Sequence, residues 1–274
     1  MSRSSTRPRA SIAPGPVAKW TILGGIGLVF LIPIASMAAF TLRDPDGGVS
    51  LTHWADLVDP ARASIYQPVW TGIGNSLVLA VVTVVIVLVL LAPTMVLVTL
   101  RFPRLRRLFE FVCLLPISIP AIVMVVGLAP IYQVIGRTFG TGIWSLAFAY
   151  GITVLPYAYR AIQNSLEAVD VVTLAEAGRS LGAGWMSVLV RVLAPNLRGG
   201  LLAASLISIA VVLGEFTIAS LLNRPNFQTM LLVVSKQDGF VSVILSLLSL
   251  LFAFVLLLVI GRAGSVGARE EESR

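Results

Sequence analysis

Long apolar runs without a charge, separated by short charged segments, make up most of this chain. A helix needs about 20 apolar residues to cross a hydrocarbon core about 30 Å thick. Five windows of this length contain no charged residue, and a sixth contains one acid, Glu215. In chain order they are residues 20–42, 63–100 (of which the second half spans), 111–136, 138–159, 199–222 and 239–261. The pattern predicts an all-α membrane protein with six transmembrane helices.

Composition and charge agree with this class. The chain is 57% hydrophobic and only 12% charged, whereas soluble domains contain roughly 25% charged residues. Short loops rich in Lys and Arg stay in the cytoplasm. If the N-terminus is inside, only five of the 20 Lys and Arg residues fall outside, namely Arg43, Arg62, Arg137, Arg224 and Lys236. We therefore expect a multi-pass protein with both termini in the cytoplasm.

The ends of the chain divide it into a transmembrane domain at residues 19–262, a Ser-, Arg- and Pro-rich disordered tail at 1–18 and a second cytoplasmic tail at 263–274. The net charge of +7 does not indicate nucleic-acid binding, because the basic residues flank helices, where they contact anionic lipid. The single Cys113 excludes an internal disulfide and is expected to be a packing residue. No catalytic set and no metal site is expected.

The longest predicted cytoplasmic segment, residues 161–198 between the fourth and fifth spans, contains a helix-turn-helix. Thr173 to Glu176 fits a capping box that starts the first helix. Gly182 supplies the left-handed residue that stops this helix. A second helix is expected over residues 184–194, ended by Pro195. The two helices would share an apolar face made of Leu174, Leu181, Trp185, Leu189 and Val192.

This segment resembles the signature of bacterial binding-protein-dependent ABC importer permeases, which reads Glu-Ala-Ala, three residues, Gly, nine residues, Ile, one residue, Leu-Pro. Glu176, Ala177, Gly182 and Pro195 match in type and spacing, and Val192 stands for Ile. Gly178 replaces the second Ala, and Ala194 replaces Leu. With the six-helix layout, the resemblance covers roughly residues 20–261.

The resemblance implies that the segment 161–198 inserts into a cleft on an ATPase, and we call it the coupling loop. The residues implied in this contact are Leu174, Glu176, Ala177, Gly178, Leu181, Gly182, Ala183, Trp185 and Pro195. The chain has no Gly-rich phosphate loop, so ATP and Mg²⁺ would be held by a partner ATPase dimer and no cofactor by this chain. The family also implies a second permease, homologous to this one, an extracytoplasmic solute-binding protein and the bacterial inner membrane.

The solute pathway has three candidate residues. Pro116 and Pro120 bend the third predicted helix, which is tolerated only where neighbours or water satisfy the freed carbonyls, so this helix should face the protein interior. Glu215 lies about two-thirds of the way through the fifth predicted span and should avoid lipid, because a charge there costs at least ~2.5 kcal/mol. It could line the pathway, form a structural pair or, less favoured, recognise a cationic solute.

The solute and the transport mechanism have competing interpretations. Residues 114–120 and 213–222 look most similar to spermidine/putrescine-type permeases, which implies a polyamine solute. Permeases for iron, thiamine, phosphonate, sulfate and molybdate have similar sequences. A secondary transporter is less favoured because such proteins usually carry several intramembrane acids or broken helices, whereas this chain has one such acid, Glu215.

Overall fold

The computed structural model describes residues 15–44 and 47–272, and within these it is helical without strands. The helices are α1 (Pro16–Thr41), α2 (Thr52–Asp56), α3 (Ala63–Ile86), α4 (Ala92–Arg101), α5 (Arg106–Leu114), α6 (Ala121–Phe139), α7 (Ala147–Ala168), α8 (Val171–Ser180), α9 (Trp185–Ser187), α10 (Ala194–Asn196), α11 (Arg198–Gly214), α12 (Thr217–Leu221), α13 (Phe227–Ser235) and α14 (Gly239–Glu272). The fold class is therefore all-α, as predicted. Most of the predicted tail 1–18 lies outside the described residues, and α14 continues through the predicted tail 263–274 as far as Glu272.

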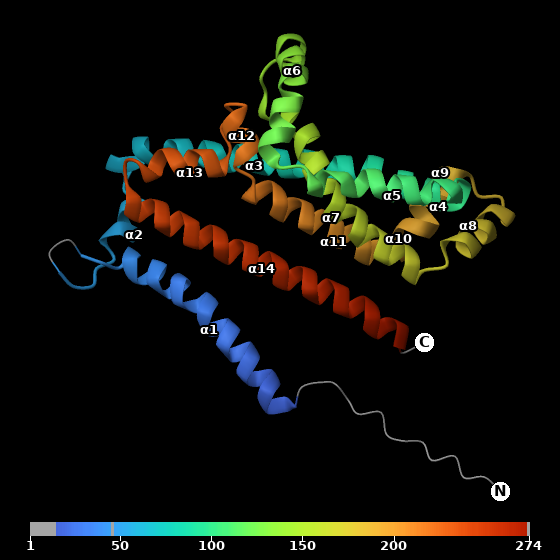
Figure 1. The fold of residues 1–274 in the computed structure, drawn as a ribbon, viewed down its shortest axis with the longest axis horizontal. Coiled ribbons are helices and arrows are strands. Elements are labelled where there is room, and N and C mark those ends of the chain that lie inside the picture. The colour runs from blue at the N-terminus through green and yellow to red at the C-terminus, as the bar shows by residue number, and fades with distance from the viewer. Residues whose placement is uncertain (1–14, 45–46, 273–274) are drawn as a thin grey trace, which may run out of the picture.

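The long helices form an elongated bundle. Helices α3, α7, α11 and α14 run along its length, and α1 lies beside α14 in the opposite direction (Figure 1). Helices α8 and α9 lie together with α4 at one end of the bundle (Figure 1). Helix α6 stands across the bundle direction, next to α12 (Figure 1). The bundle thus places the coupling loop at one tip.

Fewer than six helices in the described part of the chain are long and apolar enough to span a membrane. Within the described residues, 4 helices meet these criteria, or 5 if Trp185–Asn196 and Arg198–Gly214, which meet at 81°, form one span. The six-helix prediction is therefore not confirmed. The window 111–136 is divided between two helices but still contributes α6 as a span, whereas neither α7, in the window 138–159, nor α11 by itself, in the window 199–222, is among the 4.

The third predicted helix breaks where it was expected to bend. Helix α5 ends at Leu114, a 3-10 turn follows over Leu115–Ser118, and Ile119 is extended. Pro120 then caps α6. Because each proline removes a backbone donor, two of them four residues apart stop the helical hydrogen-bond ladder here. The break lets α6 leave the bundle direction.

Two of the other prolines inside helical runs each follow a π-helical segment. Residues Pro60–Arg101 form one run of 42 residues, in which a π-helical segment, Val87–Leu91, comes just before Pro93. A second π-helical segment, Val188–Leu193, comes just before Pro195. A π-turn widens the ladder locally and so relieves the clash between a proline ring and the preceding turn.

Close packing of α7 against α11 depends on a glycine. Gly200 of α11 is buried, and a Cβ atom there would lie 3.0 Å from the carbonyl oxygen of Ala161 and closer still to the Cβ atom of Ser165. Small residues at such crossings allow helix backbones to approach closely within a membrane protein. This crossing lies at the base of the coupling loop, so it fixes where the loop begins and ends.

Candidate functional site

Helix α8 of the coupling loop begins earlier than the sequence predicted. Its N-cap is Asp170, whose carboxylate accepts hydrogen bonds from the backbone amide of Thr173 at 3.1 Å and from its hydroxyl at 2.7 Å. The capping box over Thr173–Glu176 was therefore wrong, because Thr173 is the third residue of the helix and Asp170 accepts from its amide. These bonds, from the hydroxyl first and then the amide, hold the pKa of Asp170 below its usual value.

The end of α8 agrees with the prediction. Gly182 has a φ of +84°, a conformation that residues with a Cβ atom rarely adopt. Its amide donates to the carbonyl of Arg179 at 2.9 Å, and the amide of Ala183 donates to Gly178 at 3.1 Å. This pair of bonds is the Schellman motif, which satisfies the last carbonyls of a helix. The turn after α8 is therefore fixed by the backbone.

One side of α8 is buried against the second half of the coupling loop, and the other side is free. Val171, Ala175 and Gly178 are buried. A Cβ atom at Gly178 would lie 3.2 Å from Cγ2 of Val188 and 3.5 Å from Cγ2 of Val192. Gly178, which departs from the family pattern, thus allows this close contact.

The free side of α8 carries the matching signature residues. Glu176 and Ala177 are exposed, and Leu181 is 88% exposed at the tip of the loop. The predicted shared apolar face is therefore divided: Leu174, Leu189 and Val192 pack on the core, whereas Leu181 and Trp185 are exposed. Ala183 is half-buried and also packs on the core. The exposed set makes a small surface with one carboxylate and apolar side chains.

Trp185 connects the coupling loop to a transmembrane helix. Its ring lies 5.0 Å from the guanidinium carbon of Arg101, the last residue of α4, and 5.4 Å from that of Arg179 on α8. Such cation-π contacts contribute about 0.5–1 kcal/mol at exposed sites. Trp185 was predicted from the sequence but neither arginine was, and the contact with Arg101 could not be, because it joins residues far apart in the chain.

The second helix of the loop does not end at Pro195. The helical run continues through Pro195 to Asn196, and α11 begins at Arg198 after a bend of 81°. The side-chain amide of Asn196 donates to the carbonyl of Val192 at 2.6 Å. It satisfies a carbonyl near the site where Pro195 has no amide to donate. Pro195 is thus part of the helix and lies shortly before the bend.

An ion pair that was not predicted from the sequence joins α5 to the end of α7. Arg106 donates to the carboxylate of Glu167, which also accepts from the side-chain amide of Gln163 at 2.8 Å. The bond from Gln163, followed by the charge of Arg106, lowers the pKa of Glu167. Because both partners are about half exposed, the pair contributes little stability. It nevertheless connects two helices next to the coupling loop.

Glu215 lies in a break between two helices. Its carboxylate accepts hydrogen bonds from the amide of Ile218 at 2.8 Å and from that of Ala219 at 3.4 Å, so it caps the short α12. Its backbone carbonyl accepts from the side chain of Asn226 at 2.7 Å, and Asn226 also donates to the hydroxyl of Tyr150 at 3.2 Å. These contacts favour the structural interpretation of Glu215.

The three pathway candidates are not brought together around one cavity. Pro116 lines a cavity of about 210 Å³ with Met124, Tyr157 and Val211, and neither Pro120 nor Glu215 lines it. Pro120 is exposed, and Pro116 is half-buried. Among the described residues, no group of three or more His, Cys, Asp and Glu side chains could hold a metal ion.

Comparison with known proteins gives one family model and several curated relatives. Residues 94–264 match the model of the family described as binding-protein-dependent transport system inner membrane component. The spermidine/putrescine transport system permease protein PotC of Escherichia coli (strain K12) is 26% identical over 109 residues, which are 40% of each chain. The protein of the same name from Haemophilus influenzae is 28% identical over 109 residues, 40% of this chain and 41% of the relative. The matched segment thus covers about two-fifths of the length of these relatives.

Proposed function

Because the chain belongs to the family of binding-protein-dependent transport system inner membrane components, we propose that it is one permease subunit of an ATP-binding-cassette importer. It forms half of a solute pathway through the inner membrane, and a second, homologous permease forms the other half. An ATPase dimer binds ATP and Mg²⁺ and contacts the coupling loop. An extracytoplasmic binding protein delivers the solute to the outer side.

The observation that carries this proposal is the surface of α8. Glu176 and Ala177 are exposed on a helix that Asp170 caps at its start and Gly182 ends. The opposite side of α8 is packed on Val188, which precedes the bend into α11. A displacement of α8 by a bound ATPase would therefore reach the transmembrane helices, because closely packed elements move as units.

Two substitutions test this function of the loop. Glu176→Lys reverses the one exposed carboxylate of the α8 surface, and Gly182→Asp places a Cβ atom on a left-handed residue, which costs about 1–2 kcal/mol. We expect both to abolish ATP-driven uptake in proteoliposomes and to reduce co-purification of the ATPase. Gly184→Asp is the matched control, because Gly184 has a φ of −70° and open space around its Cβ position. Coupled transport at the wild-type rate in both test variants would contradict the proposal.

ATP hydrolysis separates this function from the alternatives. The chain alone should hydrolyse no ATP, and the complex should hydrolyse ATP faster when loaded binding protein is added. Hydrolysis by the isolated chain would contradict a non-catalytic subunit. Uptake that depends on an ion gradient and needs no ATP would instead support a secondary transporter.

For the solute, we propose a polyamine, on the basis of the names of the two relatives and of the resemblance of residues 114–120 and 213–222 to spermidine/putrescine-type permeases. Iron, thiamine, phosphonate, sulfate and molybdate are the alternative solutes. Uptake of labelled putrescine by the reconstituted complex, in competition with each alternative, distinguishes them. We expect unlabelled spermidine to compete and sulfate not to. Binding-protein capture of an alternative solute, with no polyamine uptake, would replace the polyamine and leave the permease function standing.

A further inference from the structure

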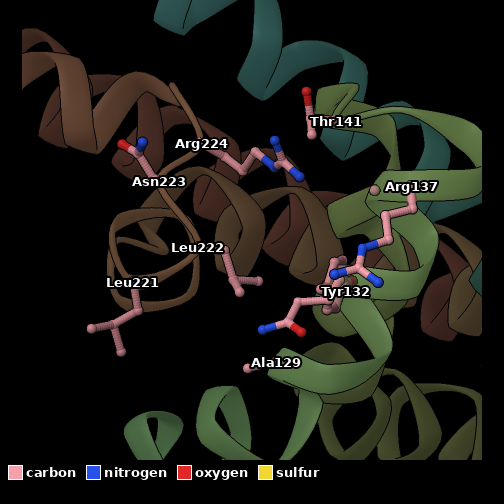
Figure 2. Close-up of a pocket in the computed structure, with 10 residues that line it drawn as sticks. Ala129, Tyr132, Arg137, Thr141, Leu221, Leu222, Asn223 and Arg224 are labelled. Carbon is pink, nitrogen blue, oxygen red and sulfur yellow. The ribbon is translucent and has the colours of Figure 1, made fainter.

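A pocket with two arginines lies between α6 and the end of α12. Its volume is about 550 Å³, and we call it the outer pocket because the predicted topology places these residues outside. Arg137 comes from α6, and Arg224 follows α12. Figure 2 shows the two side chains entering the same space from opposite walls. Gln133 and Thr141 add polar groups to the lining.

Within the part of the chain that the structure describes, the two guanidinium groups have no acidic partner. Among the described residues, no carboxylate lies within 4.0 Å of either group, and no acid lines the pocket. The Nε atom of Arg224 is buried and has no hydrogen-bond partner. A buried donor without a partner is destabilising, and more so when it belongs to a charged group. The pocket therefore has donors and positive charge that a ligand could satisfy.

The backbone fixes Arg224 at the pocket wall. Asn223 has a left-handed φ of 51°, which Asn tolerates better than most residues. The amide of Asn223 donates to Ser220 at 3.1 Å, and that of Arg224 donates to Ala219 at 2.8 Å. This Schellman motif ends α12 and sets the direction in which the chain leaves the helix at Arg224. The backbone position of Arg224 is thus built into the fold.

Tyr132 makes the opposite wall rigid. Its side chain is buried, its hydroxyl donates to the carbonyl of Ser145 at 3.0 Å, and it accepts from the amide of Ala149 at 3.1 Å. The hydroxyl is therefore occupied by α7 and its preceding turn. It holds α6 in place near Arg137, so the backbone at both arginines is positioned before any ligand binds.

We propose that the outer pocket binds an oxyanion group, such as a carboxylate, phosphate or sulfate, on a small molecule. A guanidinium presents its donors in a planar fork that matches these groups, and a volume of about 550 Å³ is in the range of small-ligand sites. A polycation is excluded here because it would meet two positive charges. The proposed function enters this proposal only to say which side of the membrane the pocket faces. The affinity of the pocket for an anion follows from its two arginines and does not depend on which solute is imported.

Chemical labelling of arginine tests the site. The assembled complex is purified in dodecyl maltoside, a detergent without phosphate, and is treated with phenylglyoxal in phosphate, sulfate, chloride or spermidine at equal ionic strength. Mass spectrometry then measures labelling at each arginine. We expect phosphate or sulfate to reduce labelling of Arg137 and Arg224 about tenfold, with no change at the exposed Arg104 and Arg107. Chloride and spermidine should not protect.

A variant and a lipid comparison identify what is bound. Arg224→Gln should remove the protection of Arg137, because one guanidinium alone holds the anion less tightly. Protection by free phosphate in detergent assigns the site to a soluble anion. Protection that requires nanodiscs of phosphatidylglycerol, without added anion, assigns the same chemistry to a lipid headgroup.

Three results would overturn the inference: no protection by any anion or lipid, equal protection by chloride, or blocked labelling of both arginines in the complex before any anion is added. The last result would mean that a partner chain covers the pocket. ATP-driven uptake is measured on the same preparation. A complex that transports but shows no protection refutes the anion site alone, whereas protection without ATP-driven uptake refutes the proposed function alone.

Discussion

One added methyl group tests the crossing of α7 and α11 below the coupling loop. In Gly200→Ala, the new Cβ atom would lie 3.0 Å from the carbonyl oxygen of Ala161 and closer still to the Cβ atom of Ser165. Neither is the flexible end of a side chain, so they move only with α7. Because non-bonded heavy atoms pack best about 3.5–4.0 Å apart, the helices must separate by at least about 0.5 Å.

The expected cost follows from two opposing effects. Overpacking costs about 1–3 kcal/mol, and replacing Gly by Ala in a helix recovers at most about 1 kcal/mol. The carbonyl oxygen of Ala161 and the Cβ atom of Ser165 cannot move without the backbone of α7, so the clash is not relieved by a side-chain rotation. We therefore expect a net destabilisation of about 1–2 kcal/mol. Gly199→Ala is the matched control, since Gly199 lies in the same turn and its Cβ position has nothing within 4 Å. It should be neutral or slightly stabilising.

Thermal unfolding of the detergent-solubilised complex, followed by tryptophan fluorescence, measures both variants. We expect a lower midpoint for Gly200→Ala only, together with less ATP-driven uptake, because the displaced α11 changes the position of the coupling loop. A Gly200→Ala protein with the same midpoint as Gly199→Ala would refute the packing argument.

The remaining predictions concern the coupling loop and Glu215. The pKa of Asp170 is lower in the folded protein than in the unfolded chain. The stabilisation of α8 by Asp170 is therefore complete above the unfolded pKa of about 4, and it is lost as the pH falls through the lower folded pKa. The protection factors for amide hydrogen exchange in α8, which correct for the intrinsic exchange rate at each pH, should fall in that window in the wild type and should be low throughout in Asp170→Ala; identical profiles would contradict this. Glu215→Ala should cost about 0.5–2 kcal/mol because α12 loses its cap, and Glu215→Gln less, so equal melting midpoints would count against capping. Trp185→Leu should lower uptake more than Trp185→Phe, which keeps an aromatic face for Arg101; equal uptake would exclude a role for this contact.

The sequence predicted features that depend on local chemistry. The all-α class and the stop at Gly182 follow from apolar runs and from the steric freedom of glycine, which neighbours cannot change. The helix break at Glu215 was not predicted, because its apolar surroundings read as one span. At the break, the backbone carbonyl of Glu215 accepts a hydrogen bond from Asn226, 11 residues away in the chain. The carboxylate of Glu215 accepts from the first free amides of α12.

The candidate site was predicted only in part, for a similar reason. Glu176 and Gly182 were located by a pattern of spacing, and the structure places both at the free side and end of α8. The contact of Trp185 with Arg101 and the pairing of Arg106 with Glu167 join separate helices, so no periodicity within one element could reveal them. Asp170 is different: an Asp before a helix is a recognised cap, and it was missed because Thr173 offered a second capping pattern three residues later.

Cross-linking from α8 to the ATPase tests the central claim most directly. Cys113 is only 2% exposed, so within this chain a maleimide cross-linker should react with an introduced cysteine alone. We predict that Ala177→Cys, on the free side of α8, gives an adduct with the ATPase in the assembled complex, and that Val49→Cys, at an 83% exposed position in the predicted outer loop, gives none. The absence of an ATPase adduct from Ala177→Cys, or equal adducts from both positions, would contradict the account.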